Sequence, residues 1–180
     1  MKAPASNLLV WVGEEVVCIR IAGRASFTSS VDFKALVNGL HQKGYSRFRL
    51  DLTHCLLMDS TFLGVLAGLG LKFGAIRNGD LDPTLELLNA NPRILDLLEN
   101  LGVSHLFKLV KGPEACTDKM APVEPTNTNP DRKEMSRTCY EAHKTLMEIN
   151  PDNIPKFKEV AQFLAEDLKK MDEDPGKPSK

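Results

Sequence analysis

Hydrophobic positions in the first part of the chain change from strand-like to helix-like spacing. Short β-branched runs at Leu8–Val12 and Val16–Ile21, separated by Gly13-Glu14-Glu15, predict two strands joined by a tight turn. The apolar residues between Val31 and Leu40 then recur at helical spacing, with Ser29 or Ser30 as the N-cap. The chain is therefore expected to open with a β-hairpin followed by a helix.

The same alternation continues to residue 110. A strand at Phe48–Leu52 leads into an apolar loop, residues 54–59, which we expect to be buried, and then into a helix over residues 62–74. Another strand at Leu85–Leu88, a helix that starts after Asn91-Pro92, and a last strand at Leu106–Val110 complete the series. This order predicts an α/β fold, a mixed β-sheet with helices packed on it, because the first two strands are too closely joined to be parallel.

Composition divides the chain into four parts. We expect a main domain over residues 1–112, a proline-rich linker over 113–130, a helical hairpin over 131–172 and a disordered tail over 173–180. The hairpin carries two apolar stripes at helical spacing, separated by a turn at Asn150–Asn153. Two stripes alone bury little surface, so the hairpin should rest on the main domain, on a second copy as a homodimer, or on a partner.

Charge and cysteine content exclude several functions. With 23 basic and 24 acidic residues the net charge is −1, which argues against a nucleic-acid partner. The longest apolar segment is too short and too interrupted for direct membrane insertion. Four separated cysteines without a C-x-x-C pair argue against a metal site and suggest reduced thiols in a cytoplasmic protein. We expect no cofactor.

The most informative residues are Asp59, Ser60 and Thr61, which precede the second predicted helix. A side-chain oxygen at this place caps free backbone N–H groups. The same N–H groups and the helix dipole would also stabilise a phosphate. Capping alone is the commoner role of such residues.

The surrounding pattern resembles the STAS domain of bacterial anti-sigma factor antagonists. Asp51-Leu52-Thr53 ends a strand, and Met58-Asp59-Ser60-Thr61 is followed by Leu63-Gly64-Val65-Leu66. The resemblance extends over roughly residues 8–110 and does not include the C-terminal hairpin. It implies a bacterial, cytoplasmic, non-enzymatic module in which Ser60 accepts phosphate from an anti-sigma factor serine kinase, and a PPM-type phosphatase removes it.

The resemblance also implies an interface around Ser60. Asp59 and Thr61 would support the phosphorylation site, and a partner would contact five residues: Phe62, Leu63, Leu66, Arg24 and Ser26. Two positions depart from the family pattern. Phe62 replaces a glycine, as an anchor or an obstruction for the kinase, and Gly23-Arg24-Ala25-Ser26 lacks the acidic residue often found in that loop.

The sequence is also compatible with two alternative functions. An enzyme would use Ser60 or Cys55 as nucleophile and His54 or His41 as base, but Ser60 is not in a G-x-S-x-G turn. His54, His105 and His143 are interpreted as ordinary packing or surface residues. The other alternative is a STAS-type scaffold or transporter-associated subunit without a sigma factor partner.

Overall fold

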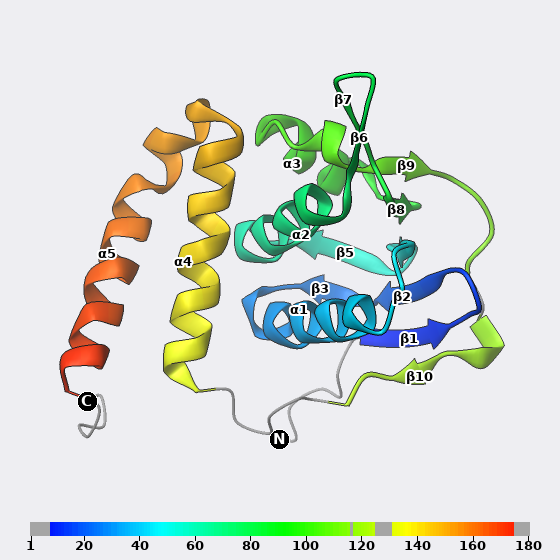
Figure 1. Ribbon diagram of the computed structural model, residues 1–180, viewed down its shortest axis with the longest axis horizontal. Coiled ribbons are helices and arrows are strands. Elements are labelled where there is room, and N and C mark those ends of the chain that lie inside the picture. Colours follow the sequence, from blue (N-terminus) through cyan, green and yellow to red (C-terminus); the bar gives the residue numbers. More distant parts are fainter. Residues whose placement is uncertain (1–7, 116, 125–130, 175–180) are drawn as a thin grey trace.

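The computed structural model describes residues 8–115, 117–124 and 131–174. A six-stranded sheet lies at its centre, with strand order β10-β1-β2-β4-β8-β9 (Figure 1). The strands are β1 (Leu8–Val12), β2 (Val17–Ile21), β4 (Phe48–Asp51), β8 (Leu85–Leu88), β9 (Lys108–Val110) and β10 (Ala121–Pro122). β1 is antiparallel to β2 and β10, and β2, β4, β8 and β9 are parallel. The expected mixed sheet and its opening hairpin are thus confirmed.

Two further strand pairs lie outside this sheet. β3 (Gly23–Ala25) is parallel to β5 (Cys55–Met58), and β6 (Ala75–Arg77) is antiparallel to β7 (Asp80–Asp82). The prediction of a loop over residues 54–59 was wrong because β3 supplies a strand partner. The Asp59 backbone N–H continues this pairing and donates to the Ala25 carbonyl at 2.9 Å.

Among the residues that the structure describes, five α-helices surround and flank the sheet. They are α1 (Phe27–Gln42), α2 (Ser60–Phe73), α3 (Pro92–Asn100), α4 (Arg132–Ile149) and α5 (Ile154–Glu173). Three short 3-10 helices are η1 (Ser104–Leu106), η2 (Thr117–Lys119) and η3 (Pro151–Asn153). The N-cap of α1 is Ser26 rather than Ser29 or Ser30. Ser30 is buried within the helix, where its hydroxyl donates to the Phe27 carbonyl at 2.7 Å.

One hydrophobic core joins the sheet to the helices. It includes Leu50 of β4, Phe33 of α1 and Phe62 of α2, and it extends to Ala142 and Leu146 of α4. Burial of α4 side chains in this core shows that the hairpin rests on the main domain, one of the three supports considered from the sequence.

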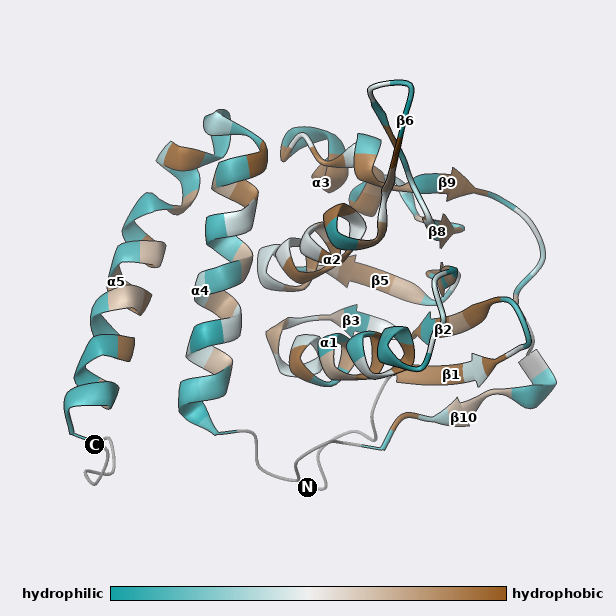
Figure 2. Cartoon of the chain, in the orientation of Figure 1, coloured by the Kyte–Doolittle hydropathy of each residue, from teal (hydrophilic) through white to brown (hydrophobic). Residues whose placement is uncertain are grey.

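Helix α4 packs against α2 and α1, and α5 packs on α4 as the outermost helix (Figure 1). Figure 2 shows hydrophobic residues along β1, whereas hydrophilic and hydrophobic residues alternate along α4 and α5. This alternation is expected for helices with one covered and one exposed face.

The first half of the expected linker belongs to the main domain. Ala115 and Val123 are buried, and Ala121 and Pro122 form β10 on the edge of the sheet beside β1. The boundary at residue 112 was therefore placed too early, because prolines are tolerated on an edge strand. Residues 125–130 of the linker and 175–180 of the tail lie outside the described residues.

Within the described ranges, no helix is both long and apolar enough to span a bilayer.

Candidate functional site

Asp59 connects the first turns of two helices. One carboxylate oxygen, Oδ1, accepts a hydrogen bond from the Phe62 backbone N–H at 2.8 Å and caps α2. The other, Oδ2, accepts from the Phe27 backbone N–H at 2.8 Å, at the start of α1. Of the three cap candidates, Asp59 is thus the N-cap, and its carboxylate stabilises two helix N-termini together.

Ser60 is the first residue of α2, is half-buried, and contacts the C-terminal hairpin. Its Oγ lies 3.0 Å from Nε2 of His143 on α4. The other ring nitrogen of His143, Nδ1, lies 2.8 Å from the Cys139 carbonyl oxygen. A carbonyl can only accept, so Nδ1 carries the proton and Nε2 of the neutral ring accepts from the Ser60 hydroxyl.

His143 is held neutral by its surroundings. It is 7% exposed, and its ring centroid lies 5.0 Å from that of Phe157 on α5. Burial lowers the pKa of His143 below its ordinary value, although the hydrogen bond to Cys139 and the charge of Asp59 act in the opposite direction. The neutral ring is the form that the Ser60 hydrogen bond requires.

Thr61 is also directed toward α4. It is buried, and its Oγ1 lies 3.6 Å from Sγ of Cys139. Burial raises the pKa of the Cys139 thiol, with Asp59 adding to the rise and the Thr61 hydroxyl opposing it. Thr61 therefore contributes a contact between the helices rather than an accessible hydroxyl.

Gly64 lets α4 approach α2 closely, whereas Gly68 on the same face has room for a methyl group. A Cβ placed on Gly64 would lie 2.5 Å from the carbonyl oxygen of Ala142 and 2.7 Å from its Cβ. A Cβ placed on Gly68, one turn later, would lie 3.8 Å from the nearest atom, in the Thr145 side chain. Ser60, Gly64 and Gly68 are spaced by four residues, so they share the helix face that α4 covers.

The three apolar residues predicted to contact a partner are in the core instead. Phe62, Leu63 and Leu66 have no exposed surface. The Phe62 ring lies 4.9 Å from that of Phe33, so it is neither an anchor nor an obstruction at the surface. The prediction of a surface role, which came from the family resemblance, was wrong because the domain's own core already buries these three side chains.

Arg24 and Ser26 lie near the same helix ends. Arg24 is exposed on β3, and half-buried Ser26 is the N-cap of α1. The hydroxyl of Ser26 lies 2.8 Å from that of Thr28. Pairing of β3 with β5 brings this segment beside Asp59.

The residues proposed as catalytic bases do not meet a nucleophile. His54 lies 3.0 Å from Glu114, and Nδ1 of His41 lies 3.1 Å from the Tyr45 carbonyl oxygen. Burial raises the pKa of the Cys55 thiol, which keeps it protonated and unreactive. His143, interpreted from the sequence as an ordinary residue, instead takes the place beside Ser60.

The Ser60–His143 pair has part of the geometry of a nucleophile and its base, since the imidazole can take the hydroxyl proton. A backbone carbonyl, not a carboxylate, orients the ring, and α4 packs against α2 where half-buried Ser60 lies. Among the described residues, no group of three or more His, Cys, Asp or Glu side chains is arranged to hold a metal ion.

Arg20 and Asp51 form a second polar cluster, at the ends of the central strands. Nη2 of Arg20 lies 2.9 Å from Asp51 Oδ2 and 3.1 Å from the Ala115 carbonyl oxygen. Burial acts to raise the pKa of Asp51, but hydrogen bonds from Thr53, Arg20 and Ala115 outweigh it and lower that pKa. This cluster attaches the segment around Ala115 to the sheet.

The mixed sheet, and the helix α2 that Asp59 caps directly before Ser60, define an α/β module. A family model, the STAS domain, matches residues 9–115. The chain therefore belongs to the STAS domain family. The match ends before α4, so the C-terminal hairpin is outside it.

Solved structures that the chain resembles include anti-sigma factor antagonists. A Thermotoga maritima protein assigned to this class is 19% identical, with a TM-score of 0.48, and the match covers 58% of this chain and 85% of the other. Unphosphorylated SpoIIAA, a Bacillus protein, is 18% identical with a TM-score of 0.47 over 59% and 87% of the two chains. An antagonist from Mycobacterium paratuberculosis is 16% identical with a TM-score of 0.47 over 61% and 89%. No curated protein matches the chain.

Proposed function

We propose that the chain is a protein-binding module of the anti-sigma factor antagonist type, switched by phosphorylation of Ser60. An anti-sigma factor serine kinase would add the phosphate in the bacterial cytoplasm, and a PPM-type phosphatase would remove it. The observation that carries the proposal is the position of Ser60, directly after the cap Asp59 at the start of α2, in a chain of the STAS family. Thr61 is buried, so Ser60 is the acceptor we favour.

Phosphorylation would change the charge and the hydrogen bonding of the site together. A phosphoserine carries about −1.5 to −2 charges at pH 7. The Asp59 carboxylate is adjacent, and each of its oxygens already accepts a backbone hydrogen bond. The phosphoryl group would also replace the hydroxyl proton that Ser60 donates to His143. A partner bound beside Ser60 would therefore face a strongly altered surface.

We place the partner-binding surface on exposed residues near Asp59. Phe27, whose backbone N–H is bound by Asp59, is 45% exposed, and Leu56 on β5 is 65% exposed. Arg24 lies on β3, the strand that pairs with β5. Exposed apolar side chains beside a charged one are typical of residues that contribute most to protein interfaces.

The test is phosphate incorporation and partner capture with the full chain. Phosphopeptide mapping of the protein from its native cell should find phosphate on Ser60. With the co-purified kinase, Ser60→Ala should abolish labelling, whereas Thr28→Ala, which removes an exposed hydroxyl at the start of α1, should not. Equal labelling of Ser60→Ala and the unaltered chain would remove Ser60 from the mechanism.

The second candidate is a STAS-type scaffold or transporter-associated subunit that is not phosphorylated. It is favoured by the hydrogen bond that already engages the Ser60 hydroxyl and by the cover that α4 provides. Co-purification distinguishes the two, since an ATP-binding serine kinase supports the switch and a transporter subunit supports the scaffold.

A further inference from the structure

The hairpin formed by α4 and α5 covers the helix that begins at Ser60. Ser60, Thr61 and Gly64 of α2 contact His143, Cys139 and Ala142 of α4, respectively. These contacts include the hydroxyl on which the proposed function depends. The matched family region ends at residue 115, so the cover is an addition to the domain rather than part of it.

The hairpin is attached firmly at its turn. The buried side-chain amide of Asn153 donates to the Leu101 carbonyl of the domain at 2.9 Å and, within the hairpin, to the Leu146 carbonyl of α4 at 2.8 Å. The Lys156 ammonium donates to the Asn100 carbonyl at 3.0 Å. Buried hydrogen bonds of this kind are costly to break, so this end is suited to act as a hinge.

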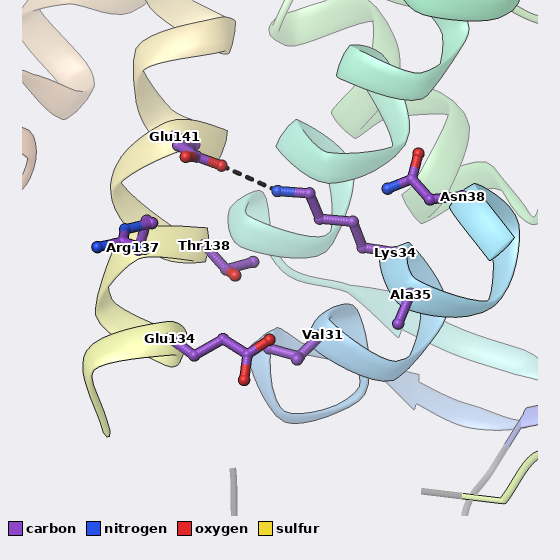
Figure 3. Close-up of a pocket in the computed structure, with 8 residues that line it drawn as sticks. All are labelled: Val31, Lys34, Ala35, Asn38, Glu134, Arg137, Thr138 and Glu141. Carbon is purple, nitrogen blue, oxygen red and sulfur yellow. Dashed lines mark hydrogen bonds and ion pairs between the residues drawn. The ribbon is translucent and has the colours of Figure 1, made fainter. Parts of the chain in front are cut away.

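The opposite end of α4 is held loosely against α1. A groove of about 290 Å³ separates the two helices there, and mainly polar and charged side chains line it (Figure 3). One ion pair crosses it, between Lys34 and Glu141 at 2.9 Å, with both side chains partly exposed (Figure 3). Exposed ion pairs contribute little, so the contact of this end with α1 rests mainly on Val31 and Thr138, which line the groove and are buried, and it is smaller than the contact of α4 with α2.

We propose that the hairpin is a hinged, autoinhibitory cover, which turns about its Asn153 end and lifts α4 from Ser60 and the Gly64 face of α2. Docking of α4 and access of a kinase or partner to Ser60 are then mutually exclusive. This inference rests on the proposed function for its biological meaning, but the opening itself does not require it.

The alkylation rate of the Cys139 thiol measures directly whether α4 separates from α2. In the docked hairpin its thiol lies against Thr61 and burial raises its pKa, which suppresses reaction with alkylating reagents. Cys18 and Cys55 are buried in the domain and report whether the domain itself unfolds. Pulsed labelling of the full chain with a maleimide, read for each cysteine by peptide mass spectrometry, separates these events.

Gly64→Ala is the variant that should open the cover, because the new methyl group would collide with the backbone of Ala142. Gly68→Ala is the matched control, since its methyl group has ordinary contact distance to Thr145. We expect Gly64→Ala to raise the labelling rate of Cys139 roughly tenfold or more, as overpacking of this kind shifts the equilibrium. Cys18 and Cys55 should stay protected, and Gly68→Ala should leave all rates unchanged.

Two results would contradict the proposal that the hairpin is a hinged cover. One is a Cys139 rate in Gly64→Ala equal to that of the unaltered chain, and the other is a joint rise at Cys139, Cys18 and Cys55, which would make the hairpin an inseparable part of the fold. The proposed function is tested separately by kinase labelling of the same variants. Faster Cys139 labelling without any phosphate on Ser60 would retain the cover and reject the phosphorylation switch.

Discussion

The hydroxyl of Ser60 and the imidazole of His143 are joined by a 3.0 Å hydrogen bond across 83 residues of sequence. The bond links the first residue of α2 to the middle of the C-terminal hairpin. Its direction is fixed by the Cys139 carbonyl, which accepts the proton on Nδ1 and leaves Nε2 as the acceptor. Any change at either residue therefore affects both the candidate phosphorylation site and the docking of the hairpin.

Ser60→Ala should destabilise the chain through His143 rather than through a lost helix cap. Asp59 supplies the cap, so the substitution leaves Nε2 buried without a donor, at a cost of about 1 to 3 kcal/mol. A double-mutant cycle with His143→Leu, measured by urea unfolding, should give a coupling energy of about 1 kcal/mol. Strict additivity of the two substitutions would show that the hydrogen bond contributes nothing.

Of the residues at this site, Asp59 should lower the unfolding free energy most when it is substituted. Asp59→Ala removes the acceptor for two backbone N–H groups, at Phe62 and Phe27, and we expect a loss of about 2 to 4 kcal/mol in unfolding free energy. Asp59→Asn keeps one oxygen for Phe62 but turns an amide donor toward Phe27, so an intermediate loss should follow. Urea unfolding of both variants tests this order, and a fully stable Asp59→Ala would contradict the bridging role.

Local sequence patterns were sufficient to predict five strands of the central sheet (β1, β2, β4, β8 and β9), the capped start of α2 and the α/β class. They rest on neighbouring residues, as in the apolar run Val17–Ile21 that forms β2. The strand β5 was missed because its partner, β3, is about 30 residues away, and no local signal reveals such pairing.

His143 and Cys139 were missed for the same reason. Both lie on the hairpin, beyond the reach of any motif around Ser60, and their spacing of four residues gave only a helix face. The spacing of small residues in α2 could have predicted a helix packed against this face, since Ser60, Gly64 and Gly68 recur every four residues. Small residues on a helix face permit a second helix to approach closely, whereas the bulky Phe62 and Leu66 positions face the core.

Asp51→Ala should lower the unfolding free energy more than removal of one residue of a more exposed ion pair. It would leave the buried Arg20 guanidinium with only the partly exposed Glu114 carboxylate as counterion and would remove an acceptor from the Ala115 backbone N–H, which should cost about 3 kcal/mol. Glu86→Ala is the control, because it breaks the more exposed pair with Arg49, which joins β4 to the neighbouring strand β8, and should cost about 1 kcal/mol or less. Similar losses in the two variants would argue against a special role for the buried pair.

Mild acidification should weaken the fold through His143. Burial places the folded-state pKa of His143 below its ordinary value of 6.5, so between these two values the unfolded chain binds more protons than the folded one. Stability then rises with pH: the contribution of neutral His143 is complete above 6.5 and is lost as the pH falls toward the lowered pKa. The nearby Asp59 carboxylate reduces this effect without reversing it, because the net pKa shift remains downward.

Urea unfolding at about pH 7.5 and about pH 5.5 tests this linkage. The unaltered chain should lose more stability on acidification than His143→Gln, whose side chain can accept from Ser60 but does not titrate in this range. His54→Gln serves as the control, since exposed His54 pairs with Glu114 and not with Ser60. If His143→Gln and the unaltered chain lose equal stability on acidification, another group is responsible for the pH dependence. Protonation of His143 would then not weaken the contact between the hairpin and Ser60.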